Sequence, residues 1–187
     1  MPLTEALVEA DFAAVMASQE YLRRWSDSSW PTDDFALADN ADDLRDHRIE
    51  HEERVAFTFS VLARDAHDVR VAGCIYIRSV IDAFATRDVR MTALAGVAPG
   101  AAIVRGWIRT DESTGLLDEL VGATVSWLGG DEWSFSEVWW QASSLVPDQL
   151  AACERTGLIR TVAVQAPGGV TWHLRAVAAP LVVTDAT

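Results

Sequence analysis

The chain has few cysteines and no long apolar run. Its two cysteines, Cys74 and Cys153, are too few for a disulfide framework and lack metal-ligand spacing, so we expect two reduced, partly buried thiols. The apolar runs are far shorter than a membrane span. The first residues lack the basic and apolar regions of a secretory signal. We therefore expect a cytoplasmic protein that does not bind a membrane.

Positive charge is scarce as well. The chain has 15 basic and 28 acidic side chains, which gives a net charge of −13. Such an excess repels nucleic acid and anionic lipid, so we expect no nucleic-acid partner. Half of the residues are apolar, which favours a globular chain over a disordered one. The length of 187 residues predicts a single domain over 1–187, with its core at about 5–178 and a short C-terminal tail.

The hydrophobic pattern changes its period along the chain. Helical spacing predicts helices, listed in chain order, over 4–24, 40–54, 116–128 and 147–157. Alternation and β-branched residues predict strands over 55–62, 69–77, 103–109, 135–142, 158–165 and 170–177. A polar hairpin connection is expected at 64–68, and the irregular stretch 79–100 is a candidate functional loop. Strands interleaved with helices after a hairpin indicate an α/β (α+β) protein with a mixed sheet covered by helices.

Gly115 stands at a strand-to-helix turn. Turns of this kind often bind phosphate, because the free N–H groups of the helix point there. Asp111 and Glu112 precede the glycine, however, and their carboxylates would repel an anion. An ordinary turn, with acidic residues that suit the helix dipole, is the other interpretation.

Three segments in this order resemble the GNAT superfamily of acyl-CoA-dependent N-acetyltransferases. They are the hairpin 57–77 with Gly73, the strand–turn–helix 107–121, and the run 149–158 that ends in Gly157-Leu158. The resemblance covers about 5–178 and implies a mixed, mostly antiparallel central sheet flanked by helices. It also implies acetyl-CoA as co-substrate, no metal, and a possible homodimer. The family's first strand is not visible, because few residues precede the first helix.

The resemblance also implies a set of cofactor-binding residues. They are Trp107, Ile108, Arg109, Ser113, Thr114, Gly115, Leu116 and Ser143. The family's pyrophosphate loop has Gln or Arg where this chain has Glu112, and a small residue where it has Leu117. The carboxylate adds like-charge repulsion, and the leucine hinders close approach of the backbone.

Two residues are candidates for the acid–base chemistry. Glu137 lies in an otherwise apolar strand near the expected acyl site, where a carboxylate would remove a proton from the attacking amine. Cys153 takes the place of the tyrosine that protonates the departing thiolate in many family members. The structural alternatives are burial with a partner or an edge position for Glu137, and packing in the core for Cys153.

The acceptor is expected to bind beside the first two helices. The candidate substrate-binding residues are Trp25, Trp30, His47, Glu50 and His51. An aromatic wall with nearby acids suits a cationic or aromatic amine. The run His47-Arg48-Ile49-Glu50-His51 also fits the H-x-x-E-H pattern of inverted zinc proteases, although a solvated or groove-lining helix face is the simpler reading.

The leading functional hypothesis is transfer of an acetyl group to a small amine or a peptide amine by direct attack on the thioester. A backbone N–H of strand 103–109 would stabilise the oxyanion. The alternative is a GNAT-fold binding or regulatory module without acyl-CoA chemistry, which the departures at Glu112, Leu117 and Cys153 favour. A zinc hydrolase is a third, more distant possibility.

Overall fold

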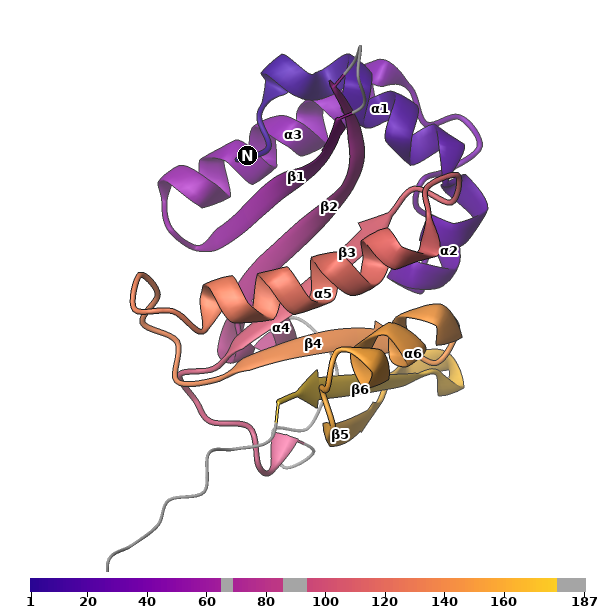
Figure 1. Cartoon of the computed structure of the whole chain (residues 1–187). Coiled ribbons are helices and arrows are strands. Elements are labelled where there is room, and N and C mark those ends of the chain that lie inside the picture. Colours follow the sequence, from indigo (N-terminus) through magenta and orange to yellow (C-terminus); the bar gives the residue numbers. More distant parts are fainter. Residues whose placement is uncertain (65–68, 86–93, 178–187) are drawn as a thin grey trace, which may run out of the picture.

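Six strands form one sheet in the computed structural model, which describes residues 1–64, 69–85 and 94–177 (Figure 1). The strand order is β1-β2-β3-β4-β6-β5. β3 and β4 pair in parallel, and the other neighbours pair antiparallel. The expected mixed, mostly antiparallel sheet is therefore confirmed. The strands are β1 (Ala56–Arg64), β2 (Val69–Ser79), β3 (Ala102–Ile108), β4 (Val138–Ser143), β5 (Arg160–Gln165) and β6 (Thr171–Ala176).

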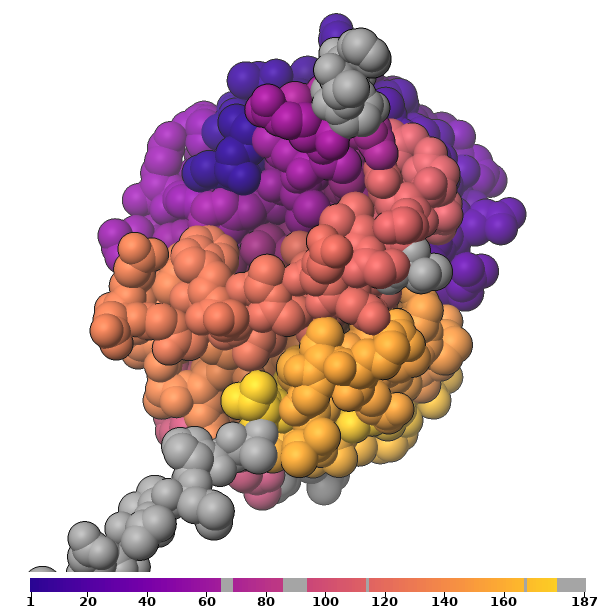
Figure 2. All heavy atoms as spheres, viewed as in Figure 1, coloured from indigo at the N-terminus to yellow at the C-terminus, as the bar shows by residue number. Residues whose placement is uncertain are grey.

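Helices cover both faces of this sheet. One face, which we call the N-terminal face because the N-terminal helices cover it, carries five helices of the described chain. They are η1 (Glu5–Leu7), α1 (Val8–Ala17), α2 (Gln19–Ser26), α3 (Leu37–Glu52) and α4 (Val80–Ala85). The opposite face carries α5 (Thr114–Leu128) and α6 (Pro147–Arg155), and the turn η3 (Pro167–Gly169) joins β5 to β6. Figure 1 shows α5 lying across the sheet, and Figure 2 shows α5 and α6 as adjoining parts of one surface. Within the described ranges, every helix falls short of the length and hydrophobicity needed to span a bilayer.

Side chains alternate between the two faces along each strand. On β3, Val104 packs toward α5, whereas Trp107 packs against α1 and α2. On β4, Trp140 joins the α5–α6 core, and its neighbour Trp139 joins the core of the opposite face. All three tryptophans are almost completely buried. The high tryptophan content of the chain therefore contributes mainly to the core on both sides of the sheet.

Several elements differ from the sequence-based expectations. The helix expected over 4–24 is divided at Ser18, whose N–H donates to the Val15 carbonyl. The stretch 79–100, expected to be irregular, begins with α4, which is too short to show a helical period. The remainder of that stretch at 86–93, and the hairpin connection at 65–68, lie outside the described residues.

Where the resemblance implies a first strand, residues 1–3 form a short pairing with β1. The Leu3 N–H donates to the Thr58 carbonyl at 3.0 Å, and the Ser60 N–H donates to the Met1 carbonyl at 2.8 Å. Pro2 forms a bridge opposite Phe59. Pro2 is tolerated there because its nitrogen points away from β1, so the pairing needs no N–H from it.

A gap between two strands positions the site. The parallel pairing of β3 with β4 covers three residue pairs and ends at Val104 and Trp140. Beyond that point β4 continues its pairing with β6 as far as Ser143, while β3 continues beside β2. The C-terminal halves of β3 and β4 therefore separate, and their facing backbone groups need other partners.

Candidate functional site

Buried side chains bridge the gap between β3 and β4 at Gly106. The Gly106 carbonyl accepts hydrogen bonds from the Trp25 indole N–H at 2.8 Å and from the Gln149 amide at 2.7 Å. The same Gln149 amide nitrogen lies 3.0 Å from the Tyr21 hydroxyl oxygen, and the Gln149 side-chain oxygen accepts from the Trp140 indole at 3.4 Å. The gap is thus crossed by a chain of hydrogen bonds from α2 to α6.

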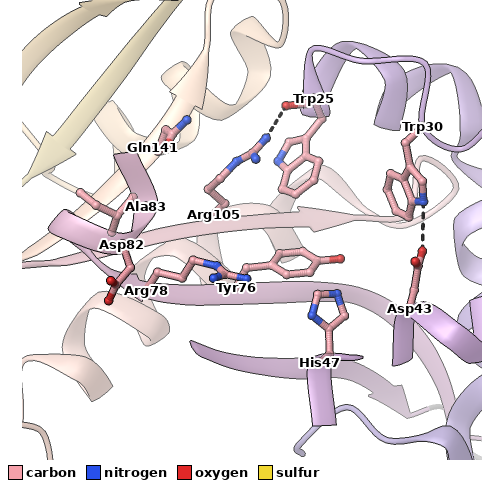
Figure 3. A pocket seen from close by; sticks show the side chains of 11 residues that line it. Trp25, Trp30, Asp43, His47, Tyr76, Arg78, Asp82, Ala83, Arg105 and Gln141 are labelled. Atoms are coloured by element: carbon pink, nitrogen blue, oxygen red, sulfur yellow. Dashed lines mark hydrogen bonds between the residues drawn. The ribbon is translucent and has the colours of Figure 1, made fainter. Parts of the chain in front are cut away.

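One cavity lies on the N-terminal face of the sheet beside this gap. We call it the aromatic cavity, and Figure 3 shows the side chains that line it. Its volume is about 470 Å³. Its walls come from α2, α3, α4 and strands β2 to β4. Its lining residues are Trp25, Trp30, Asp43, His47, Tyr76, Arg78, Asp82, Ala83, Ile103, Arg105 and Gln141. Three of the five residues expected to bind substrate, Trp25, Trp30 and His47, therefore meet here.

Polar contacts fix the side chains of the aromatic cavity. The Arg105 guanidinium lies 4.1 Å from the centre of the Trp25 ring and donates to the Trp25 carbonyl at 2.8 Å. The Trp30 indole donates to the Asp43 carboxylate at 3.3 Å. Burial raises the pKa of Asp43 above its ordinary value. One end of the cavity therefore presents the Arg105 guanidinium, held by Trp25. The other end presents the Asp43 carboxyl group, held by Trp30.

Glu50 contacts two of the lining residues, Arg78 and His47, but does not line the cavity itself. One of its oxygens accepts from Arg78 at 2.6 Å, and the other lies 3.5 Å from His47 Nδ1. His51 lies elsewhere, because its ring packs against Phe57 and Phe59 at 5.1 and 5.2 Å. Among residues 1–64, 69–85 and 94–177, no group of three or more His, Cys, Asp or Glu side chains is placed to hold a metal ion. The zinc-site interpretation therefore gains no support from this part of the chain.

A second cavity, which we call the turn cavity, lies at the N-terminal end of α5. Its volume is about 350 Å³. Its lining residues are Tyr21, Arg24, Ile108, Arg109, Thr110, Glu112, Ser113, Leu117, Asp148 and Arg155. Ser113 stands at the N-cap without a side-chain cap, and the first turn of α5 carries no acidic residue. The helix therefore begins with backbone N–H groups that lack a side-chain acceptor.

The two carboxylates before Gly115 are paired with arginines. Glu112 accepts two hydrogen bonds of 2.8 Å from Arg70, and its side chain is only 10% exposed. Asp111 accepts hydrogen bonds of 2.9 and 2.7 Å from Arg109, which lower the pKa of Asp111. The negative charge that the sequence places at this turn is therefore largely balanced.

Two further arginines line the turn cavity. Arg155 is paired with Asp118 at 2.7 Å. Arg24 is exposed, and no carboxylate of the described chain forms an ion pair with it. A multiply charged anion in this cavity would thus meet an arginine that is not ion-paired with any described carboxylate.

Some of the residues expected to bind the cofactor line the turn cavity, and others are buried away from it. Ile108, Arg109 and Ser113 line the turn cavity, and Gly115 lies in the first turn of α5, which begins at Thr114. Trp107 is fully buried and donates to the Tyr76 hydroxyl at 3.3 Å. Leu116 packs against the α5 core, and the buried Ser143 hydroxyl accepts from the Leu145 N–H at 3.2 Å.

The two expected catalytic residues lie outside both cavity linings. Cys153 is completely buried in the α5–α6 core, and burial raises the pKa of its thiol to about 12. Glu137 accepts from Arg160 at 2.7 Å and from the Trp139 indole at 2.9 Å. Its burial opposes ionisation, but these hydrogen bonds outweigh burial and hold the pKa of Glu137 below its ordinary value. The geometry brings neither side chain to the gap.

Sequence reasoning missed Tyr21, Gln149, Arg105 and Gln141. Arg105 and Gln141 are polar residues within apolar strands. The reasoning that singled out Glu137 would have found both. Tyr21 and Gln149 carry no such signal, because each is one polar residue on an amphipathic helix.

No family model and no curated protein matches this sequence. Solved structures do match its fold. Aminoglycoside acetyltransferase AAC(6')-Ib in complex with coenzyme A and kanamycin has a TM-score of 0.65 and 16% identity, over 94% of this chain and 92% of that one. Ribosomal-protein-S5-alanine acetyltransferase from Vibrio fischeri has a TM-score of 0.64 and 13% identity, over 94% and 89%.

A third match is the microcin C7 self-immunity acetyltransferase MccE in complex with acetyl-CoA and AMP. Its TM-score is 0.65 at 11% identity, over 94% of this chain and 87% of that one. The chain has the GNAT fold. In this GNAT fold, β3, the Gly115 turn and α5 are the strand–turn–helix that the sequence singled out, and the turn cavity lies against them.

Proposed function

We propose that this protein transfers an acetyl group from acetyl-CoA to an amine bound in the aromatic cavity. The observation that carries the proposal is the pair of cavities at the gap between β3 and β4. Tyr21 lines the turn cavity, Trp25 lines the aromatic cavity, and the Gln149–Gly106 contact links them. Acetyl-CoA supplies an activated acyl thioester. The turn cavity would bind coenzyme A, and the aromatic cavity would bind the amine.

The turn cavity suits the phosphate groups of coenzyme A. Backbone N–H groups at the start of a long helix bind anions, and Arg24 adds positive charge. A Cβ atom built on Gly115 would meet nothing within 4 Å, so open space lies beside the backbone there. Leu117, expected to obstruct the loop, packs into the core and is 7% exposed. Glu112 is held by Arg70 and so adds little repulsion.

The aromatic cavity supplies a group that can take a proton. The reaction needs a neutral amine as nucleophile. His47 lines the cavity, and the Glu50 carboxylate stands 3.5 Å from its Nδ1, where it would stabilise an imidazolium. His47 accepts the proton from the amine directly or through one water.

Acetyl-CoA binding is the direct test of this function. Acetyl-CoA at millimolar concentration should raise the melting temperature of the purified chain, because a ligand that binds only the folded state stabilises it. Thiol release measured with a mixture of amines should then exceed the rate without amine. No thermal shift and no binding heat with acetyl-CoA would overturn the proposal and leave a GNAT-fold binding module.

Gly115→Ala should weaken acetyl-CoA binding without harming the fold. The added methyl group meets no atom of the protein within 4 Å. Alanine also favours the helix, so the free protein should keep or gain up to about 1 kcal/mol of stability. The methyl group occupies the space where a phosphate would approach the backbone. We expect the dissociation constant for acetyl-CoA to rise about ten-fold, measured by isothermal titration calorimetry.

Gly122→Ala is the matched control on the same helix. Its added Cβ would lie 3.7 Å from the Thr156 methyl group, an ordinary contact. The variant should gain a similar amount of stability and bind acetyl-CoA like the unchanged protein. Equal affinities for all three proteins would show that the Gly115 turn does not bind the phosphates.

A further inference from the structure

The aromatic cavity contains a buried amide that has no partner among the described residues. Gln141 on β4 is 3% exposed, and it lines the cavity (Figure 3). Its side chain makes no hydrogen bond with any residue in the described ranges. Buried side-chain amides are nearly always hydrogen-bonded, and one that opens onto a cavity is suited to a ligand.

Arg105 stands beside this amide. Arg105 and Gln141 each directly follow the last backbone pair of the two strands, Val104 with Trp140. Stacking on the Trp25 ring and the bond to the Trp25 carbonyl fix the plane of the Arg105 guanidinium. A guanidinium has five N–H donors in a planar fork that matches a carboxylate. Both side chains therefore offer donors to an oxyanion at the mouth of the gap.

The far end of the aromatic cavity has the opposite character. Trp30, Tyr76 and the His47 ring form aromatic walls there, and the Asp43 carboxylate is the acceptor. Among the described residues, the lining includes two arginines, Arg78 and Arg105, and two aspartates, Asp43 and Asp82. A polycation would meet both arginines, and a phosphate dianion would meet both aspartates. A zwitterion matches this balance of charge.

We propose that the acceptor is an α-amino acid whose carboxylate binds to Arg105 and Gln141. This inference rests on the proposed acetyl transfer. The α-amine of an amino acid is attached to the same carbon as the carboxylate, so it lies at the gap between β3 and β4. The side chain then extends between the aromatic walls toward Asp43. Arg105 and Gln141 determine specificity by favouring amines that carry the carboxylate, since an amine without it leaves the Gln141 amide without a partner among the described residues.

Matched ligands that differ only by the carboxylate test this inference. The pairs are L-phenylalanine with phenethylamine, L-tryptophan with tryptamine, and L-arginine with agmatine. Calorimetric titration of the full chain without acetyl-CoA should show about ten-fold tighter binding of the amino acid in at least one pair. The inference is overturned if no pair shows this preference, whether because the two members bind equally or because neither binds.

Two variants test whether Arg105 and Gln141 cause the preference for the amino acid over the matched amine. Gln141→Leu and Arg105→Gln should each reduce the preference to less than about three-fold. Gln141→Leu removes an amide without a partner, so its melting temperature should not fall. Gln165→Leu on β5 and Arg45→Gln on α3 are exposed controls outside the cavity and should keep the preference. A preference that survives in both cavity variants contradicts the inference.

The outcomes separate this inference from the proposed function. If the chain prefers the carboxylate ligands but does not bind acetyl-CoA, the proposed acetyl transfer is wrong and the inferred amino-acid site remains supported. Acetyl transfer to phenethylamine as fast as to L-phenylalanine would keep the proposed function and overturn the inference.

Discussion

Gln149→Leu should lower the free energy of unfolding by about 2–4 kcal/mol. Gln149 is completely buried, and its amide makes contacts of 2.7, 3.0 and 3.4 Å with the Gly106 carbonyl, the Tyr21 hydroxyl and the Trp140 indole. Leucine fills a similar volume but can make none of these contacts. Buried polar groups on both sides of the gap would then lose a partner, and each loss costs about 1–3 kcal/mol.

The other glutamines of the sheet provide the controls. Gln141→Leu also places a leucine in a buried position, but the amide that it removes has no partner among the described residues. Its stability should stay within about 0.5 kcal/mol of the unchanged protein or exceed it. Gln165→Leu is exposed and should also change stability little. Urea unfolding at a shared m-value measures all three. Equal stability for Gln149→Leu and Gln141→Leu would show that the bridge across the gap contributes nothing.

The Gln149 bridge also explains how this fold holds its two cavities at a fixed spacing. β3 and β4 share no backbone pairing beyond Val104 and Trp140, so α6 can be tied to β3 only through side chains. Gln149 provides that tie and keeps Tyr21 and Trp25 on either side of Gly106. A change at this position would therefore alter stability and the alignment of the two cavities together.

The sequence predicts the order of elements well, because each strand and each long helix carries its own hydrophobic period. The Pro147 start and the Gly157 end of α6 are confirmed, since Pro147 is in its first turn and Gly157 follows with φ of +80°. The meeting of Trp25, Trp30 and His47 in one cavity follows from two helices that must pack on the same sheet face. Local patterns contain this kind of information.

Partners from distant parts of the chain were not predictable. The sequence shows the carboxylate of Glu112 beside Gly115, but its partner Arg70 lies on a strand 42 positions away. Glu137 looks like an unexplained charge until β5 brings Arg160 to it. The Gly106 carbonyl, which holds the gap together, has no side chain at all. Whether a polar group is satisfied depends on tertiary packing, which no local pattern encodes.

Asp11→Asn should stabilise the protein by about 2–3 kcal/mol at neutral pH. Asp11 lies on α1, is 3% exposed, and has one carboxylate oxygen that no described residue hydrogen-bonds. Burial, with a smaller contribution from the nearby negative charge of Asp43, raises the pKa of Asp11 from 3.8 to about 6. At pH 7 the folded protein must therefore carry an unfavourable buried charge, which asparagine avoids.

The sign of the pH dependence follows from the two pKa values. Between 3.8 and about 6 the unfolded chain has already released the Asp11 proton, whereas the folded chain still holds it. The folded state binds more protons in this window, so the contribution of Asp11 to stability falls as the pH rises. A pKa difference of about two units corresponds to about 3 kcal/mol. Below the window Asp11 is neutral in both states and resembles asparagine.

The difference in unfolding free energy between Asp11→Asn and the unchanged protein should therefore depend on pH. It should be near zero below about pH 3 and reach its full value above about pH 6, as measured by urea unfolding across this range. Asp131→Asn, an exposed change in the loop after α5, should show no such pH dependence. A difference for Asp11→Asn that stays constant with pH would mean that Asp11 is paired or solvated in the folded state.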